Sequence, residues 1–221
     1  MSDTADFSPS DARRHYDRTA AKQDRQAWYE DVALRHLLAH GEFSKAHVVV
    51  EAGCGTGRFA EWLFSDALSA EAHFIGIDIS SSMLHRAARR LAPFSRASLV
   101  QADATVAMPL RTASCDRFVV AYMFDLLAPE QSLALLGEAH RVLSPGGLLC
   151  LAGLTSAAPT ALSRLVARAL SAIRRRAPGR LGGCRPVSLA AQLDGRKWEI
   201  RDRTVVARFA VASEAIVALR R

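Results

Sequence analysis

The sequence predicts an α/β domain in which helices cover both faces of a mostly parallel sheet. The first observation is the apolar run Val48–Val50, which ends in Glu51 and leads into a glycine turn and an amphipathic stretch. Second, further strand-length apolar runs follow it, with predicted helices between them. Third, the chain has 221 residues and half of them are hydrophobic, which suffices for one domain with a sizeable core. Continuous Val, Ile and Leu runs are typical of buried parallel strands.

The elements are expected in a regular order. A helical region from about residue 9 to residue 40 comes first. After the first strand, further strands are predicted at Phe74–Ile77, Leu99–Ala104, Asp116–Tyr122 and Leu148–Leu151, with helices near Arg58–Leu68, Ser81–Leu91 and Pro129–Leu143. Pro145-Gly146-Gly147 is expected to end the last helix and reverse the chain. The runs 198–206 and 214–219 leave no room for a helix between them, so they predict an antiparallel pair.

Three glycines at alternate positions, Gly53, Gly55 and Gly57, follow Glu51. Glycine lacks a Cβ atom, so such a turn lets a ligand approach the backbone closely. Ligands of open parallel sheets bind beyond the carboxyl ends of the strands, which is where this turn lies. The spacing differs from the dinucleotide fingerprint G-x-G-x-x-G, because the third glycine comes one residue too early.

Acidic residues end the next two predicted strands. Asp78 is placed to accept hydrogen bonds from both ribose hydroxyls of an adenosine ligand, and Asp103 follows the third strand. Taken singly, Asp78 could cap the helix that starts near Ser80, Asp103 could close a turn, and the glycines could serve close packing. Three acids at three successive strand ends favour a binding site.

These motifs resemble those of class I S-adenosylmethionine (SAM)-dependent methyltransferases. The glycine turn matches their Glu-x-Gly-x-Gly-x-Gly element, and Glu138–Gly147 matches E-x-x-R-V-L-x-P-G-G. The resemblance covers about residues 46–152. It implies a Rossmann-like three-layer α/β/α sandwich with a seven-stranded, mostly parallel sheet of order 3-2-1-4-5-7-6 and an antiparallel last strand. We expect a single domain, 1–221, with a helical cap (9–40), a cofactor core (46–152), a lid or insert (155–193) and C-terminal strands (198–220).

The resemblance implies SAM as cofactor and S-adenosylhomocysteine as product, with the glycine turn at the amino-acid end, Asp78 at the ribose and Asp103 at the adenine. Glu51 orients the loop, bonds a water or bonds the cofactor ammonium, and the sequence leaves these roles open. The residues expected to bind the cofactor are Glu51, Ala52, Gly53, Gly55, Gly57, Asp78, Ile79, Met83, Asp103, Ala104 and Ala121.

The acceptor site is expected to come from the segments outside this core. Tyr122 and Asp125 follow the fourth strand, and Tyr16-Asp17 resembles an element with which many small-molecule methyltransferases begin. Tyr122, Tyr16 and Asp125 are therefore the predicted catalytic residues, although amphipathic packing explains Tyr16 equally well. The weaker candidates are His15, Trp28, Tyr29, His140 and Cys184.

The acceptor class is only narrowed. Residues 121–125 lack the Asn/Asp-Pro-Pro-aromatic motif of nucleobase-amine enzymes, so nucleic acid is not favoured as a partner. A small-molecule acceptor, quinone-precursor-like or otherwise aromatic, is preferred. The basic stretch 160–176, in a chain of net charge +7, leaves open a phospholipid amine N-methyltransferase with peripheral membrane contact. A non-catalytic SAM-binding protein is the third hypothesis.

The remaining expectations concern metal and location. The four cysteines have no zinc-site spacing, so no metal is expected. They also lack the pairing of a disulfide framework, and the first residues lack the apolar core of a signal peptide, which predicts a cytoplasmic protein. The oligomeric state stays open.

Overall fold

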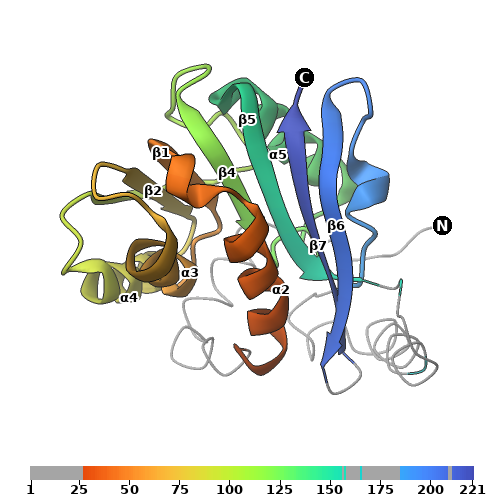
Figure 1. The fold of residues 1–221 in the computed structure, drawn as a ribbon, viewed down its shortest axis with the longest axis horizontal. Helices are drawn as coiled ribbons and strands as arrows, with labels where there is room; N and C mark the ends of the chain where they lie inside the picture. The colour runs from red at the N-terminus through yellow and green to blue at the C-terminus, as the bar shows by residue number, and fades with distance from the viewer. Residues whose placement is uncertain (1–26, 156, 158–164, 166–184, 209–210) are drawn as a thin grey trace.

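The computed structural model describes residues 27–155, 157, 165, 185–208 and 211–221. They form one seven-stranded sheet in the order β3-β2-β1-β4-β5-β7-β6. Strands β1 to β5 pair in parallel, and β7 is antiparallel to both β5 and β6. Helices lie on both faces of this sheet (Figure 1). The predicted three-layer architecture and strand order are confirmed.

The strands lie close to their predicted positions. They are β1 (Val48–Ala52), β2 (His73–Asp78), β3 (Ala97–Gln101), β4 (Cys115–Ala121), β5 (Leu143–Leu154), β6 (Trp198–Arg208) and β7 (Val211–Arg220). The longer helices are α2 (Ala27–His40), α3 (Arg58–Trp62), α4 (Ser81–Leu91) and α5 (Pro129–Val142), and short helical turns occupy Phe43–Lys45 and Ala190–Gln192.

Two predicted elements need correction. The helix expected over Arg58–Leu68 is α-helical only to Trp62, and residues Leu63–Ala67 form a π-helical turn. The backbone N–H of Leu68 closes that turn by donating to Leu63 O at 2.7 Å, five residues back.

The second correction concerns the predicted Pro-Gly-Gly turn. Helix α5 already ends at Val142, and β5 begins at the next residue. The pairing of β4 with β5 then jumps from Cys115–Leu143 to Arg117–Leu148. The Pro-Gly-Gly segment lies in this irregularity, where Gly146 has the left-handed φ of 77° that glycine tolerates. The chain reverses within an interrupted strand rather than before it.

Alternate side chains of the central strands enter two different hydrophobic layers, as expected for a sheet covered on both faces. Helix α5 packs on one face through Leu135, Ala139 and Val142. Helix α2 packs on the other face through Ala33, Leu34 and Leu37. Figure 1 shows α2 in front of the sheet and α5 behind it. The edge of the sheet between these layers holds the cavity described below.

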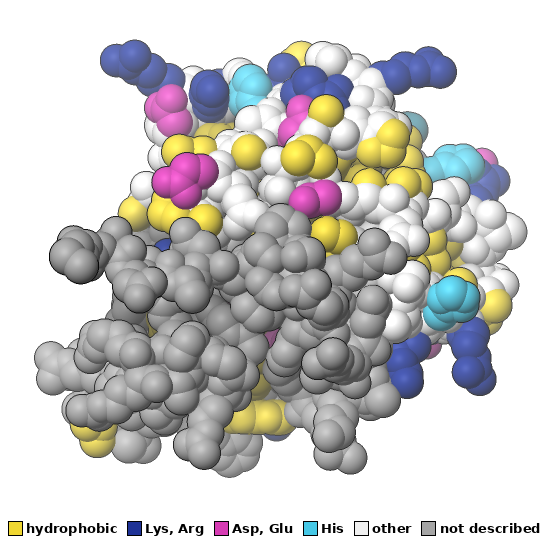
Figure 2. Space-filling view, turned by 180° about the vertical axis from the view of Figure 1, so that it is seen from behind, with side chains coloured by type: hydrophobic (Ala, Val, Ile, Leu, Met, Phe, Trp, Pro, Cys, Tyr) yellow, Lys and Arg dark blue, Asp and Glu magenta, His cyan; other side chains and the backbone are white. Residues whose placement is uncertain are grey.

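The predicted cap before residue 27 and most of the predicted insert, including the basic stretch 160–176 apart from Leu165, lie outside the described residues. Within the described ranges, no helix is both long and apolar enough to cross a bilayer. On the face shown in Figure 2, the described Lys and Arg side chains lie mainly at the upper edge and lower right, with hydrophobic and uncharged side chains between them.

Candidate functional site

A cavity opens where β1, β2 and β4 end, beyond the carboxyl ends of the parallel strands, as the strand-end rule predicts. The loop after β3 and helix α2 complete its wall. Most of the predicted site residues line it: Glu51, Gly53, Gly55, Asp78, Ile79, Met83, Asp103, Ala104, Ala121 and Tyr122. Ala52, Gly57 and Asp125 are not part of the lining, and Tyr16 lies outside the described residues.

Asp78 ties the glycine loop to the end of β2. Its Oδ2 accepts a hydrogen bond from the Gly55 N–H at 2.9 Å, and its Oδ1 accepts one from the Ser80 N–H at 2.8 Å. The cap of α4 is Ser80, whose Oγ accepts from the Met83 N–H at 3.2 Å. Asp78 therefore does not cap this helix, and its carboxylate lies in the cavity wall beside the loop.

The three loop glycines all have left-handed φ angles, 72° at Gly53, 54° at Gly55 and 75° at Gly57. A Cβ on Gly57 would lie 3.2 Å from atoms of Ala87 and Leu91, so this glycine allows α3 to start against α4. A Cβ on Gly55 would meet no atom of the described residues within 4 Å. Gly57 therefore serves close packing, which was the alternative interpretation of these glycines, whereas Gly55 borders open space in the cavity.

Glu51 is a buried carboxyl group in the cavity wall. Glu51 is 3% exposed, and its Oε2 has no hydrogen-bond partner among the described residues. Burial, with a smaller contribution from the nearby Asp78, raises the pKa of Glu51 to about 8, and Arg58 opposes the shift. A cationic group entering the cavity would satisfy this oxygen and favour its charged form.

Asp103 serves a turn and the cavity at the same time. Its Oδ1 accepts hydrogen bonds from the Thr105 N–H at 2.9 Å and from the Thr105 hydroxyl at 2.7 Å. The residue also lines the cavity. Asp103 therefore closes a turn, as the alternative interpretation predicted, and it can still contact a ligand in the cavity.

Helix α2 contributes a charged wall that the sequence reasoning missed. Arg58 donates to Glu30 Oε2 at 2.7 Å and also pairs with Asp31, and both Glu30 and Arg58 line the cavity. Arg58 directly follows the glycine loop and Glu30 follows Tyr29, a weak acceptor candidate. No local pattern connects these residues, because the contact joins two elements that are distant in sequence.

Tyr122 is hydrogen-bonded to β7, which lies two strands from β4 in the sheet. Its hydroxyl donates to Ser213 Oγ at 2.9 Å, and its ring packs edge-on against Tyr29 with centroids 5.8 Å apart. Burial raises the pKa of the Tyr122 hydroxyl above its ordinary value. Its φ of 52° is unusual for an aromatic residue, and such strain is often held at functional sites.

Asp125 is buried outside the cavity lining. Its backbone oxygen accepts from the Arg185 N–H at 2.8 Å, while its Oδ1 has no partner in the described part of the chain. Burial, with a smaller contribution from the acid Glu30, raises the pKa of the Asp125 carboxyl to about 7, although a hydrogen bond from its own backbone and the charge of Arg185 oppose the rise.

The weaker candidates divide in the same way. Tyr29 contacts Tyr122, whereas Trp28 is 43 % exposed. His140, on α5, packs edge-on against Trp198 with ring centroids 5.4 Å apart, and it is not part of the cavity wall. His15 and Cys184 lie outside the described residues.

Comparison with known proteins agrees with this geometry. Residues 49–147 match the family model described as a methyltransferase domain. A malonyl-[acyl-carrier protein] O-methyltransferase of Marinomonas sp. is 31% identical over 154 residues, which are 68% of this chain and 54% of that protein. A ubiquinone/menaquinone biosynthesis C-methyltransferase of Syntrophotalea carbinolica is 35% identical over 118 residues, 53% of this chain and 46% of that protein. The chain spans about half the length of these relatives.

The solved structures extend the similarity to almost the whole chain at the level of the fold. The N-methyltransferase NodS from Bradyrhizobium japonicum WM9, in complex with S-adenosylhomocysteine, superimposes with a TM-score of 0.71 at 18% identity, covering 95% of this chain and 98% of that one. The matched domain, the strand order and the motifs at the strand ends together show that this chain resembles the class I SAM-dependent methyltransferases.

Proposed function

We propose that this chain transfers the methyl group of SAM to a small-molecule acceptor. The observation that carries the proposal is the buried Glu51 Oε2 in the cavity wall, beside the glycine loop and Asp78, which has no hydrogen-bond partner among the described residues. A buried carboxyl oxygen without a partner is costly, so its retention at a cavity is explained by a cationic ligand group. The ammonium of the amino-acid end of SAM is such a group.

The remaining wall residues fit the rest of the cofactor. Asp78 is assigned to the ribose hydroxyls, since a carboxylate accepts hydrogen bonds from both, and Asp103 to the adenine amino group. The open space at Gly55 lets the cofactor approach the backbone. When bound, SAM supplies an electrophilic methyl group, so the protein has to align the acceptor and exclude water.

The acceptor is assigned to the aromatic and apolar part of the wall. Tyr122, Met123, Leu126 and Leu127 lie between the end of β4 and α5, and Leu34 faces the cavity from α2. Such a lining suits a flat, largely apolar molecule, and ligand sites commonly combine apolar walls with few polar groups. An aromatic, quinone-precursor-like acceptor agrees with the quinone-biosynthesis relative. Of the predicted catalytic residues, Tyr122 lines the cavity and is kept as the candidate, whereas Asp125 is outside the lining.

Calorimetric titration with S-adenosylhomocysteine, with NAD as a control ligand, tests the cofactor assignment. Micromolar binding of the first and none of the second is expected. Asp78→Ala removes two charge-assisted hydrogen bonds to the ribose, each worth about 1.5–3 kcal/mol, so affinity should fall at least about tenfold. An unchanged dissociation constant would refute the ribose role.

Asp116→Ala is the matched control. Asp116 Oδ2 also accepts two backbone hydrogen bonds, from His47 and Val48 at 2.6 and 2.8 Å, but Asp116 does not line the cavity. It should lower stability without changing affinity. Formation of S-adenosylhomocysteine from SAM with a panel of hydroxylated aromatic acceptors then tests methyl transfer itself. Binding without product for every acceptor would support a non-catalytic role instead.

A further inference from the structure

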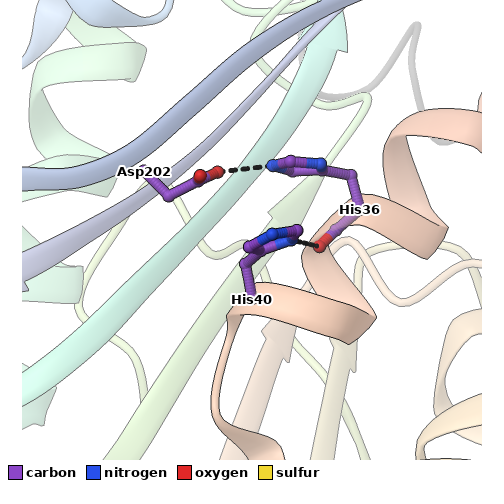
Figure 3. A group of neighbouring side chains, drawn as sticks. All are labelled: His36, His40 and Asp202. Atoms are coloured by element: carbon purple, nitrogen blue, oxygen red, sulfur yellow. Dashed lines mark hydrogen bonds and ion pairs between the residues drawn. The ribbon is translucent and has the colours of Figure 1, made fainter.

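We propose that His36, His40 and Asp202 form a Zn²⁺ site that fastens α2 to β6. Each of the three residues offers one ligand atom, and these atoms lie within 4.8 Å of one another. Figure 3 shows the two imidazole rings stacked on α2 and the Asp202 carboxylate reaching them from β6. The group lies apart from the cavity, since none of the three residues lines it.

Helix α2 presents two imidazoles side by side. His36 and His40 are four residues apart, which places them on the same helix face one turn apart. Their rings stack with centroids 4.0 Å apart. The neighbouring Leu37 is fully buried, so the orientation of the helix on the sheet holds this histidine face towards β6.

A bulge in β6 brings the third ligand to the same place. Ile200 pairs with Ala218, but Asp202 pairs with Val217, so Arg201 is an extra residue in the strand. In a regular strand, Ile200 and Asp202 would point to the same face. The bulge moves Asp202 to the face of Val217, which belongs to the layer packed against α2. Bulges commonly re-aim a side chain in this way.

The hydrogen bonds already fit a metal-binding arrangement. His40 Nδ1 lies 2.9 Å from the carbonyl oxygen of His36. A carbonyl only accepts, so Nδ1 carries the proton and Nε2 of a neutral ring keeps its lone pair for a metal. Such a second hydrogen bond is typical of metal-binding histidines. His36 Nε2 contacts Asp202 Oδ2 directly, and a metal ion would take the place of the proton between them.

The donor set favours zinc. Two imidazole nitrogens and one carboxylate suit Zn²⁺, whereas Mg²⁺ and Ca²⁺ prefer oxygen ligands only. Bonds of about 2.0–2.2 Å place tetrahedral ligand atoms about 3.4 Å from one another. The His36 and Asp202 ligand atoms, now in direct contact, would move apart by about 1 Å, and the more distant ligand atoms would approach by roughly 1–1.5 Å, which side-chain rotation supplies. The side chains of His36 and Asp202 are 20% and 32% exposed, which gives the ion a path to the site and leaves room for a water ligand.

The consequence concerns the cavity wall. Helix α2 also carries Glu30 and Leu34, which line the cavity. A metal ion at the end of α2 would hold this wall on the sheet independently of any bound cofactor.

Titration of the full, tag-free, metal-stripped chain with ZnCl₂, measured by calorimetry, tests the proposal. Thermal unfolding with and without zinc gives a second measurement. The wild type should bind one equivalent of zinc, and His40→Gln and Asp202→Asn should each lower the zinc affinity at least about tenfold. His85→Gln is the matched control, because His85 makes the same Nδ1 contact, with Ser81 O at 2.8 Å, but belongs to no such cluster among the described residues.

At a hundredfold excess over its dissociation constant, zinc should raise the Tm of the wild type and of His85→Gln by about 5–10 °C. The Tm of His40→Gln should not move, and its metal-free Tm should equal that of the wild type because His40 is exposed. Equal zinc binding by wild type, His40→Gln and Asp202→Asn, or no binding at micromolar zinc, would overturn the proposal and leave a plain His36–Asp202 pair. No cofactor or acceptor is present, so the outcome is independent of methyl transfer.

Discussion

The neighbouring strands β1 and β4 each end near a buried carboxyl group, but the two groups face different surroundings. Glu51 and Asp125 are 3% and 2% exposed, and each has one carboxyl oxygen without a partner among the described residues. Burial raises the pKa of both, to about 8 and about 7. Only Glu51 lines the cavity. Burial and a raised pKa therefore do not by themselves identify a binding group. A ligand can pair with the carboxyl oxygen only where the carboxyl group also lines a cavity.

The pH dependence of stability gives the largest expected difference. Both carboxyls have higher pKa values in the folded chain than their ordinary 4.5 and 3.8, so between those values the folded state binds more protons. Their contribution to stability is complete below about pH 4 and is lost as the pH rises through about 7 and 8. Glu51→Gln should flatten the fall of Tm between about pH 4.5 and 8, and Asp125→Asn between about pH 3.8 and 7. Thermal unfolding across this range measures both slopes.

Ligand binding sharpens the same comparison. Saturating S-adenosylhomocysteine should remove the Glu51 part of the slope, because the ligand ammonium stabilises the charged carboxylate. It should leave the Asp125 part unchanged. The assignment of Glu51 would be contradicted if the Glu51→Gln and wild-type profiles were already parallel without ligand, or if they still differed in slope at saturating ligand.

Within the glycine loop, Gly57 and Gly55 give a second, smaller comparison between a packing position and a cavity position. Gly57→Ala should destabilise the fold by about 1–3 kcal/mol, since alanine is strained at a φ of 75° and its Cβ would press on Ala87 and Leu91. Gly55→Ala should cost only the backbone strain of about 1–2 kcal/mol but should weaken S-adenosylhomocysteine binding more. Denaturant unfolding and calorimetry separate the two effects.

Gly137→Ala is the control for these substitutions. Gly137 lies on the exposed side of α5, and a Cβ there meets nothing within 4 Å. Alanine should therefore stabilise the helix by about 0.5–1 kcal/mol. If Gly55→Ala left binding unchanged, the open space at Gly55 would not belong to the cofactor.

The smallest expected effect is at the end of β4. Tyr122→Phe removes the hydrogen bond to Ser213, which should lower stability by about 1 kcal/mol and leave cofactor affinity unchanged. If the hydroxyl also faces the acceptor, turnover should fall as well. Ser213→Ala breaks the same bond and keeps the hydroxyl, so equal turnover losses in both variants would assign Tyr122 a structural role only.

Much of the cofactor side of the site was predictable because its signals are local. The apolar run before Glu51, the alternate glycines and the acids at 78 and 103 all lie within single strand–turn units. Parallel strands bring their carboxyl ends to one edge of the sheet, so the order of these units implies that the residues meet there. The structure confirms that Glu51, Asp78 and Asp103 line one cavity.

The other contributions depended on contacts between segments far apart in the chain. Arg58 meets Glu30 because α2 packs on the sheet, and Asp125, whose backbone oxygen accepts a hydrogen bond from Arg185, is not part of the cavity lining. Asp202 reaches His36 only because Arg201 is an extra residue opposite β7. Local sequence patterns therefore determined the fold and the edge of the sheet at which the cavity opens. Tertiary structure decided the α2 wall and the histidine cluster, since strand register and helix docking arise from side-chain packing across the whole sheet.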